Sequence, residues 1–140
     1  NGKLWVLCSG IQDWLNPSND TPGKLVRLNP STKTIELSLS FASTSDHPMS
    51  LETNTAKDKL YYNLNGGVFE ISINATSLPA SALLNRNFYN IGIDPVSGYL
   101  FGCNAADFVQ NGYIVRYNLS SVALVDSFQV GVIPGNFYFN

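Results

Sequence analysis

The 140-residue chain has few of the side chains that usually carry chemistry, with one histidine, two cysteines and one methionine. It also has little charge of either sign, since eight basic and ten acidic residues give a formal net charge of −2. Without an excess of basic residues it has no electrostatic attraction for a phosphate backbone or an anionic membrane surface. Nucleic acid is therefore not an expected partner.

Long hydrophobic runs are also absent, because no apolar stretch approaches the roughly 18 residues of a membrane span. The first residues have neither an initiator Met nor the basic segment of a signal peptide. We expect a domain without membrane spans, cut from something longer.

The scarce reactive residues do not form a recognisable catalytic or metal motif. Asp46 and His47 lie among several serines, but a hydrolase needs a nucleophile, base and orienting group together, and no Gly-x-Ser-x-Gly turn is present. We interpret His47 as a solvated turn residue. One His and two separated Cys cannot make a zinc site, and residues 16–20 lack the spacing of a calcium loop. We expect no catalytic residues, no metal and no cofactor.

Hydrophobic residues make up 44% of the chain and aromatic residues 12%, which is enough apolar material for one compact domain. Turn formers and β-branched residues are common and good helix formers are few, a balance typical of an all-β protein. The only weak helical candidate is residues 77–85. Cys8 and Cys103 follow apolar runs, and we interpret both as buried free thiols.

An internal repeat is the most informative feature. Three motifs recur in turn, each with one copy per repeat: a Gly or Asp two residues before Leu and an aromatic, a β-rich run ending in Asn, and an alternating segment ending in Asn or Asp. The first motif occurs at residues 2–5, 58–61 and 98–101, the second at 26–29, 71–74 and 115–118, and the third at 51–54, 91–94 and 137–140. A period of about 40 to 50 residues built from short strands is typical of a β-propeller with four-stranded antiparallel blades. A β-sandwich is the alternative.

The repeat divides the chain into about three blades within one partial propeller domain, residues 1–140. The predicted boundaries are 1–41 for blade 1, 46–84 for blade 2 and 88–128 for blade 3, followed by a closing inner strand at 130–140. In blade 2 the predicted strands, from the centre outward, are 51–54, 60–63, 68–74 and 82–84. We expect Leu4, Leu60 and Leu100 to be equivalent and buried.

The phase of the repeat leaves both ends unfinished. Each internal inner strand ends six residues before the leucine of the next strand, and counting back from Leu4 leaves no room for one. The C-terminal strand accordingly belongs to another blade. Because open strand edges attract pairing, we expect either missing blades or a second copy to pair there.

These repeats, with Pro-x-x-Leu on an inner strand, Asp-Lys-Leu-Tyr at residues 58–61 and the closing run at 131–140, resemble the YVTN-type seven-bladed propellers of Bacteroidetes. That resemblance implies a surface or periplasmic protein, held at the outer membrane by a lipid anchor that this chain lacks. It also implies capture of a ligand such as cobalamin, with an outer-membrane transporter as a partner.

Loop lengths indicate where a ligand would bind. The loops joining the second and third strands of a blade are long in blades 1 and 3, at residues 9–22 and 104–111, and long insertions on one face are where function concentrates. An exposed aromatic ring beside a carboxylate and an amide suits a flat polar ligand such as a sugar or corrin. The alternative is that Trp14 and Phe108 fold back into their own loops. The candidate ligand-binding residues of this face are Gln12, Asp13, Trp14, Asp46, His47, Tyr89, Asp107, Phe108 and Gln110.

The leading interpretation is a non-catalytic binding module for a small molecule, glycan or protein. A propeller enzyme of the lactonase or quinoprotein kind is one alternative, although the inner strands offer few polar residues for a central metal or cofactor. A purely structural or adhesive protein–protein module is another.

Overall fold

The computed structural model describes residues 2–140, and in this part of the chain the regular structure is ten β-strands and one short 3₁₀ turn, η1 (Pro17–Asn19). The strands are β1 (Leu4–Cys8), β2 (Lys24–Asn29), β3 (Thr34–Ser40), β4 (Met49–Thr53), β5 (Lys59–Leu64), β6 (Gly67–Ser72), β7 (Asn90–Ile93), β8 (Tyr99–Asn104), β9 (Asn111–Asn118) and β10 (Ala123–Val132). The all-β prediction is confirmed. No helix among these residues could cross a membrane.

The strands form three antiparallel sheets, which we call sheets 1, 2 and 3 in chain order. Sheet 1 is β1-β2-β3, sheet 2 is β4-β5-β6, and sheet 3 is β7-β8-β9-β10. The fourth strand predicted for sheet 2 is reduced to one bridge between Val68 and Leu84. Sheet 3 extends to Val132, past its predicted end.

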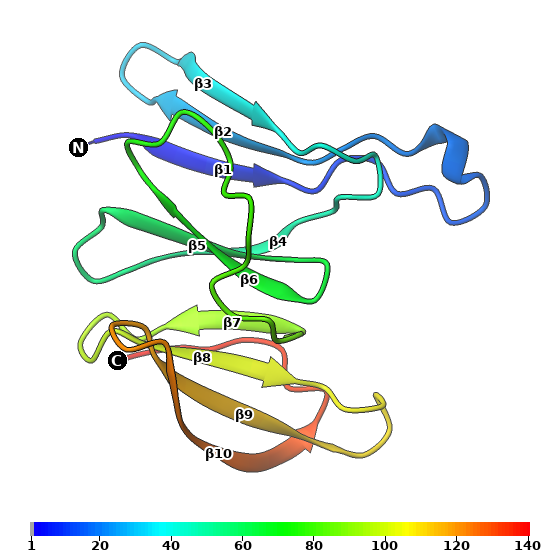
Figure 1. Ribbon diagram of the computed structural model, residues 1–140, viewed down its shortest axis with the longest axis vertical. Coiled ribbons are helices and arrows are strands. Elements are labelled where there is room, and N and C mark those ends of the chain that lie inside the picture. The colour runs from blue at the N-terminus through cyan, green and yellow to red at the C-terminus, as the bar shows by residue number, and fades with distance from the viewer. Residues whose placement is uncertain (1) are drawn as a thin grey trace.

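The sheets stack face to face in chain order, as Figure 1 shows from top to bottom. Sheet 2 lies in the middle and is covered on both faces. Tyr61 packs with Leu100 and Val115 of sheet 3, whereas Leu60 and Tyr62 pack with Leu25 of sheet 1. Since successive side chains of a strand point to opposite faces, this explains why β5 has large apolar or aromatic side chains at three successive positions, residues 60–62, instead of alternating ones.

Asn and Asp residues recur at strand ends because their side chains build the turns. The Asn29 Oδ1 accepts hydrogen bonds from the backbone N–H groups of Ser31 and Thr32, and the Asn118 Oδ1 does the same for Ser120 and Ser121. These are Asx turns, which give the backbone a local partner where the ladder stops.

Pairing register aligns β1, β5 and β8 of the three sheets, but one leucine differs from expectation. Leu4, Leu60 and Leu100 pair with Leu28, Ile71 and Tyr117, respectively. Leu60 and Leu100 are 5% and 0% exposed, but Leu4 is 52% exposed. The prediction that Leu4 is buried is wrong, because no sheet of the described residues covers that face of sheet 1.

Three other expectations differ from the structure. Cys8 is exposed, because it lies on the uncovered face of sheet 1, whereas Cys103 is buried as predicted. The counterpart of Leu28 in sheet 2 is Ile71, so the second motif of the middle repeat is out of register by two residues. The segment 130–140 is not a strand of its own: residues 130–132 extend β10, and residues 133–140 have no ladder partner in the described chain.

Candidate binding face

Both long loops lie at one end of the stacked sheets, which we call the loop end. The first joins β1 to β2 and the third joins β8 to β9, and Figure 1 shows both on the right, where β1 and β8 end. Between them, sheet 2 has only the tight turn at Asn65 and Gly66, both with positive φ. The loop asymmetry read from the sequence is therefore present in space.

The first loop is folded around the carboxylate of Asp13. One oxygen accepts the backbone N–H groups of Leu15 and Asn16, each at 3.0 Å, and the other accepts the amide of Asn19 at 2.9 Å. The Asp13 N–H in turn donates to Asp20 Oδ1 at 2.7 Å. The hydrogen bond from Asn19, followed by those from Asn16 and Leu15, lowers the pKa of Asp13. Asp13 therefore holds the backbone of its loop in place through hydrogen bonds, a role that we call bracing.

Because polar atoms close this loop, its apolar side chains are not needed inside it. Trp14 is 82% exposed and Leu15 97% exposed. The alternative in which Trp14 folds back into its loop does not occur. Leu15 was not among the predicted residues, although its place beside Trp14 in a polar segment was a usable signal.

In the third loop, Asp107 holds the backbone in the same way as Asp13 does in the first. Its carboxylate accepts the backbone N–H groups of Val109 and Gln110, and Gln110 also donates its side-chain amide to the second oxygen at 3.1 Å. These bonds, led by the backbone N–H of Gln110, lower the pKa of Asp107. Asp107 and Gln110 thus bond mainly to each other and to their own loop.

The apolar residues of the third loop point outward as well. Phe108 is 54% exposed and its neighbour Val109, another residue missed from the sequence, is 77% exposed. The Phe108 ring meets the half-exposed ring of Tyr89 edge-on, with centroids 5.7 Å apart and planes at 82°. A hollow of about 260 Å³ lies beside this pair, lined also by Met49, Asn87 and Asn104.

Asp46 and His47 serve the loop end as braces. Asp46 accepts the Ser43 N–H at 2.9 Å and the Asn65 amide at 2.8 Å. The His47 Nδ1 lies 2.8 Å from the carbonyl oxygen of Ser9, and its side chain is only 13% exposed. The interpretation of His47 as a solvated residue is wrong, because the ring joins the β3–β4 connection to the base of the first loop.

The structure brings some of the predicted residues together and keeps others apart. Tyr89 and Phe108 form a pair, Asp107 and Gln110 brace one loop, and Asp13 braces the other. Gln12 is exposed beside Asp13. Trp14 and Phe108 belong to loops of different sheets, and no ring contact joins them within residues 2–140. The loop end thus has two separate groups of exposed aromatic side chains, which we call aromatic displays: Trp14 on the first loop, and Phe108 with Tyr89 at the third.

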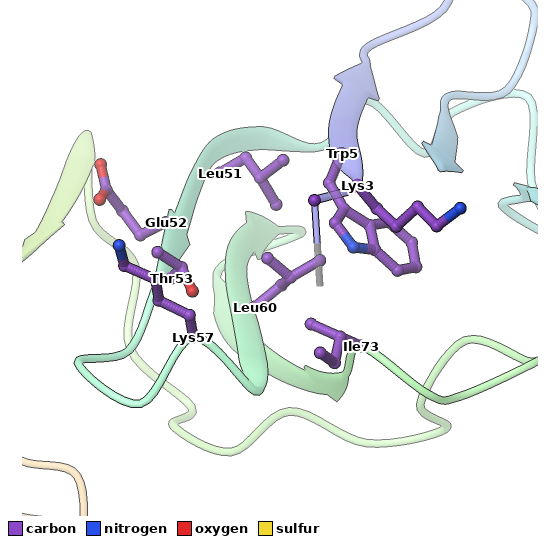
Figure 2. Close-up of a pocket in the computed structure, with 9 residues that line it drawn as sticks. Lys3, Trp5, Leu51, Glu52, Thr53, Lys57, Leu60 and Ile73 are labelled. Carbon is purple, nitrogen blue, oxygen red and sulfur yellow. The ribbon is translucent and has the colours of Figure 1, made fainter. Parts of the chain in front are cut away.

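A separate cavity of about 390 Å³ lies between the free edge of β1 and sheet 2, away from both long loops. Figure 2 shows Trp5 facing Leu51 and Leu60 across it, with Glu52 pointing to the far side of β4. Burial raises the pKa of Glu52. Among the described residues, no three His, Cys, Asp or Glu side chains are grouped closely enough to hold a metal ion.

Comparison with known proteins bears on the fold alone. No family model and no curated protein sequence matches the chain. Among solved structures, hydrazine synthase of Kuenenia stuttgartiensis is similar, with a TM-score of 0.59 and 13% sequence identity over 85% of this chain. The chain spans 32% of the length of that protein's chain. At this identity the likeness concerns the arrangement of strands.

Proposed function

We propose that sheets 1, 2 and 3 are blades of a β-propeller and that the loop end is a non-catalytic ligand-binding face. Support for the blades comes from the shared register of β1, β5 and β8 and from the stacking of the sheets in chain order. Propeller blades stack in this way around a central axis.

The observation that carries the proposal is the display of aromatic rings on braced loops. Trp14 and Phe108 are exposed although each loop is already closed by hydrogen bonds to an aspartate. Contiguous exposed apolar patches mark binding sites, and each of these rings has an exposed aliphatic neighbour, Leu15 or Val109. A ring held on a rigid loop offers contact area at little cost in conformational entropy.

The ligand class follows from the shape of the two displays. Each presents an exposed aromatic ring with an aliphatic neighbour and a border of polar groups, and Tyr89 adds a second ring beside Phe108. This arrangement suits a ligand with a flat apolar face and polar edges. A glycan or a corrin such as cobalamin has this chemistry. Location at the cell surface or in the periplasm, and delivery to an outer-membrane transporter, belong to the same proposal through the resemblance to YVTN-type propellers.

The test is calorimetric titration of cobalamin and of a panel of oligosaccharides. Trp14→Ala and Phe108→Ala should each weaken binding by about 1 to 3 kcal/mol, the scale of an aromatic anchor. Leu124→Ala is the control, because Leu124 is an apolar side chain of similar exposure on β10, outside the long loops. Equal affinity of all three variants for every ligand that binds would refute the loop end as the site. Binding of a protein only would favour the interaction-module alternative.

A further inference from the structure

Residues 134–140, which we call the tail, hold the place of an inner strand although they form no strand ladder within the described chain. Ser50 of β4 donates a hydrogen bond to the Oδ1 of Asn90 in β7, and the Asn90 Nδ2 donates to the Oδ1 of Asn136 at 2.7 Å. The three residues each come just before the equivalent positions Leu51, Ile91 and Phe137. One polar ladder thus crosses β4, β7 and the tail.

A second contact gives the same alignment from the other side of the strand. Gly23, next to β2, packs so closely on the Pro48 ring that an added Cβ would lie 2.4 Å from its Cδ. Gly112 of β9 meets Pro134 in the same way, at 2.6 Å. Pro48 and Pro134 both come three residues before the first inward side chain, Leu51 or Phe137. The tail therefore lies on sheet 3 as β4 lies on sheet 1.

The tail turns its large rings toward sheet 3. Phe137 fills the space above Gly92, where an added Cβ would come within 2.7 Å of the ring, and both Phe137 and Phe139 contact Phe101. Tyr138, between them, is 90% exposed. This alternation is that of a strand with one face packed and one face free, and its backbone N–H and C=O groups have no ladder partner among residues 2–140.

Sheet 1 has the complementary gap. β1 is its edge strand, and the cavity of Figure 2 lies along it, bounded by Trp5 on one side and Leu51 and Leu60 on the other. In sheet 3 the corresponding position beside β8 is filled by β7. The outer face of sheet 1 is apolar and partly or fully exposed, with Leu4, Val6, Cys8, Leu28 and Ile35 on it. The outer face of sheet 3, which the tail covers only in part, is apolar too, with Phe101, Ile114 and Phe128 lining a second hollow.

We propose that the tail of a second copy of this chain pairs with β1 and completes sheet 1. In sheet 3, Ile91 of β7 pairs with Gly102 of β8, and Ile93 pairs with Leu100. Because Phe137 is equivalent to Ile91 and Leu4 to Leu100, the same register places Phe137 opposite Val6, Tyr138 opposite Trp5 and Phe139 opposite Leu4. The tail also remains packed on sheet 3 of its own copy. The outer face of sheet 1 in the second copy therefore covers the apolar outer face of this sheet 3. The inference rests on the propeller arrangement proposed above.

Reciprocal donation gives both copies the same interface, as two-fold symmetry requires. Two copies with three sheets each form a ring of six, within the roughly four to eight blades of known propellers. Pairing also removes the open edge of β1 and the unpaired backbone of the tail, both of which are templates for association.

A single substitution tests the register with a native thiol. The same alignment places Gly135 opposite Cys8, which is exposed, and an added Cβ at Gly135 meets nothing within 4 Å. Gly135→Cys should form a disulfide-linked two-copy species under mild oxidation, and the additional change Cys8→Ser should abolish it. Gly131→Cys is the matched control, since its position is equally open but is not opposite Cys8.

Sedimentation of the unmodified 140-residue chain gives the second readout, with the mass of two copies expected at micromolar concentration. A stable single copy, or equal crosslinking of Gly135→Cys and Gly131→Cys, would overturn the proposal and leave the groove beside β1 to a strand from elsewhere. Titration of the loop-end ligand on the same variants keeps the two proposals distinguishable, because strand donation can fail while ligand binding persists.

Discussion

The interface between sheets 2 and 3 and the loop end contain similar aromatic residues in opposite environments. At the interface, Phe88 and Tyr61 are buried against Leu100 and Val115. At the loop end, Trp14 and Phe108 are exposed on segments closed by polar hydrogen bonds. The difference shows that an aromatic ring is buried where a second sheet faces it and stays exposed where a carboxylate already holds the backbone of its loop.

The largest effect on stability is expected inside the interface. Leu100 is completely buried between sheets 2 and 3, so Leu100→Ala should lower the free energy of unfolding by about 2 to 5 kcal/mol, because it leaves a cavity that the sheets cannot close. Leu124→Ala is the control, since Leu124 is 56% exposed on β10 and should cost about 1 kcal/mol or less. Urea unfolding measures both. Equal losses would show that the two sheets are not a shared core.

The two cysteines extend the comparison, since Cys8 ends β1 at the loop end and Cys103 lies in the interior of sheet 3. Cys8 is exposed, whereas burial raises the pKa of Cys103 to about 11. Because the thiolate is the reactive form, a thiol reagent at pH 8 should modify one site per folded chain at a dilution where the chains are single copies, and two sites after denaturation. Cys8→Ser should leave the folded chain unreactive. Rapid modification of that variant would contradict the burial of Cys103.

The smallest effect is local and concerns the braces of the long loops. Asp13→Ala and Asp107→Ala should make residues 9–22 and 105–110, respectively, easier to cleave by protease, with little change in global unfolding. Asp126→Ala, which removes a carboxylate bonded to Arg116 on the strands, should not. Cleavage of all three variants at the wild-type rate would show that these carboxylates do not hold the loops.

The same braces predict a pH dependence. Hydrogen bonds lower the pKa of both carboxyls in the folded chain. Their contribution is therefore complete above the ordinary aspartate pKa of about 3.9 and is lost as pH falls through the lowered values. Loop protection, followed by hydrogen exchange of the Leu15 and Gln110 amides, should persist at pH 5 and decline only in stronger acid.

The strand sets could be predicted from the sequence because they depend on local signals. The Asn and Asp residues that end the motifs, such as Asn29 and Asn118, build turns through their own side chains, and the spacing between them fixed the three sheets. Exposure could not be predicted in the same way. Leu4 and Leu100 occupy equivalent positions, and only the presence of a covering sheet makes one exposed and the other buried.

The position of the long loops at one end of the sheets could be predicted from the sequence, but the roles of their residues could not. Loop length identified the loop end, yet an aspartate beside an aromatic residue looks the same in sequence whether it contacts a ligand or its own backbone. The structure shows that Asp13, Asp46, Asp107 and His47 brace the loops. Because polar side chains hold the loops, four apolar side chains stay exposed to solvent: Trp14, Leu15, Phe108 and Val109.

The fluorescence of Trp14 tests the binding face most directly. In a Trp5→Phe variant Trp14 is the remaining tryptophan, because the chain has two. An exposed Trp14 should give emission typical of a water-exposed indole that acrylamide quenches readily. When a bound glycan or corrin covers the ring, the emission should shift to the blue and be protected from quenching. Emission typical of a buried indole, or an unchanged spectrum with a ligand that calorimetry shows to be bound, would contradict the assignment of the braced loops as the binding face.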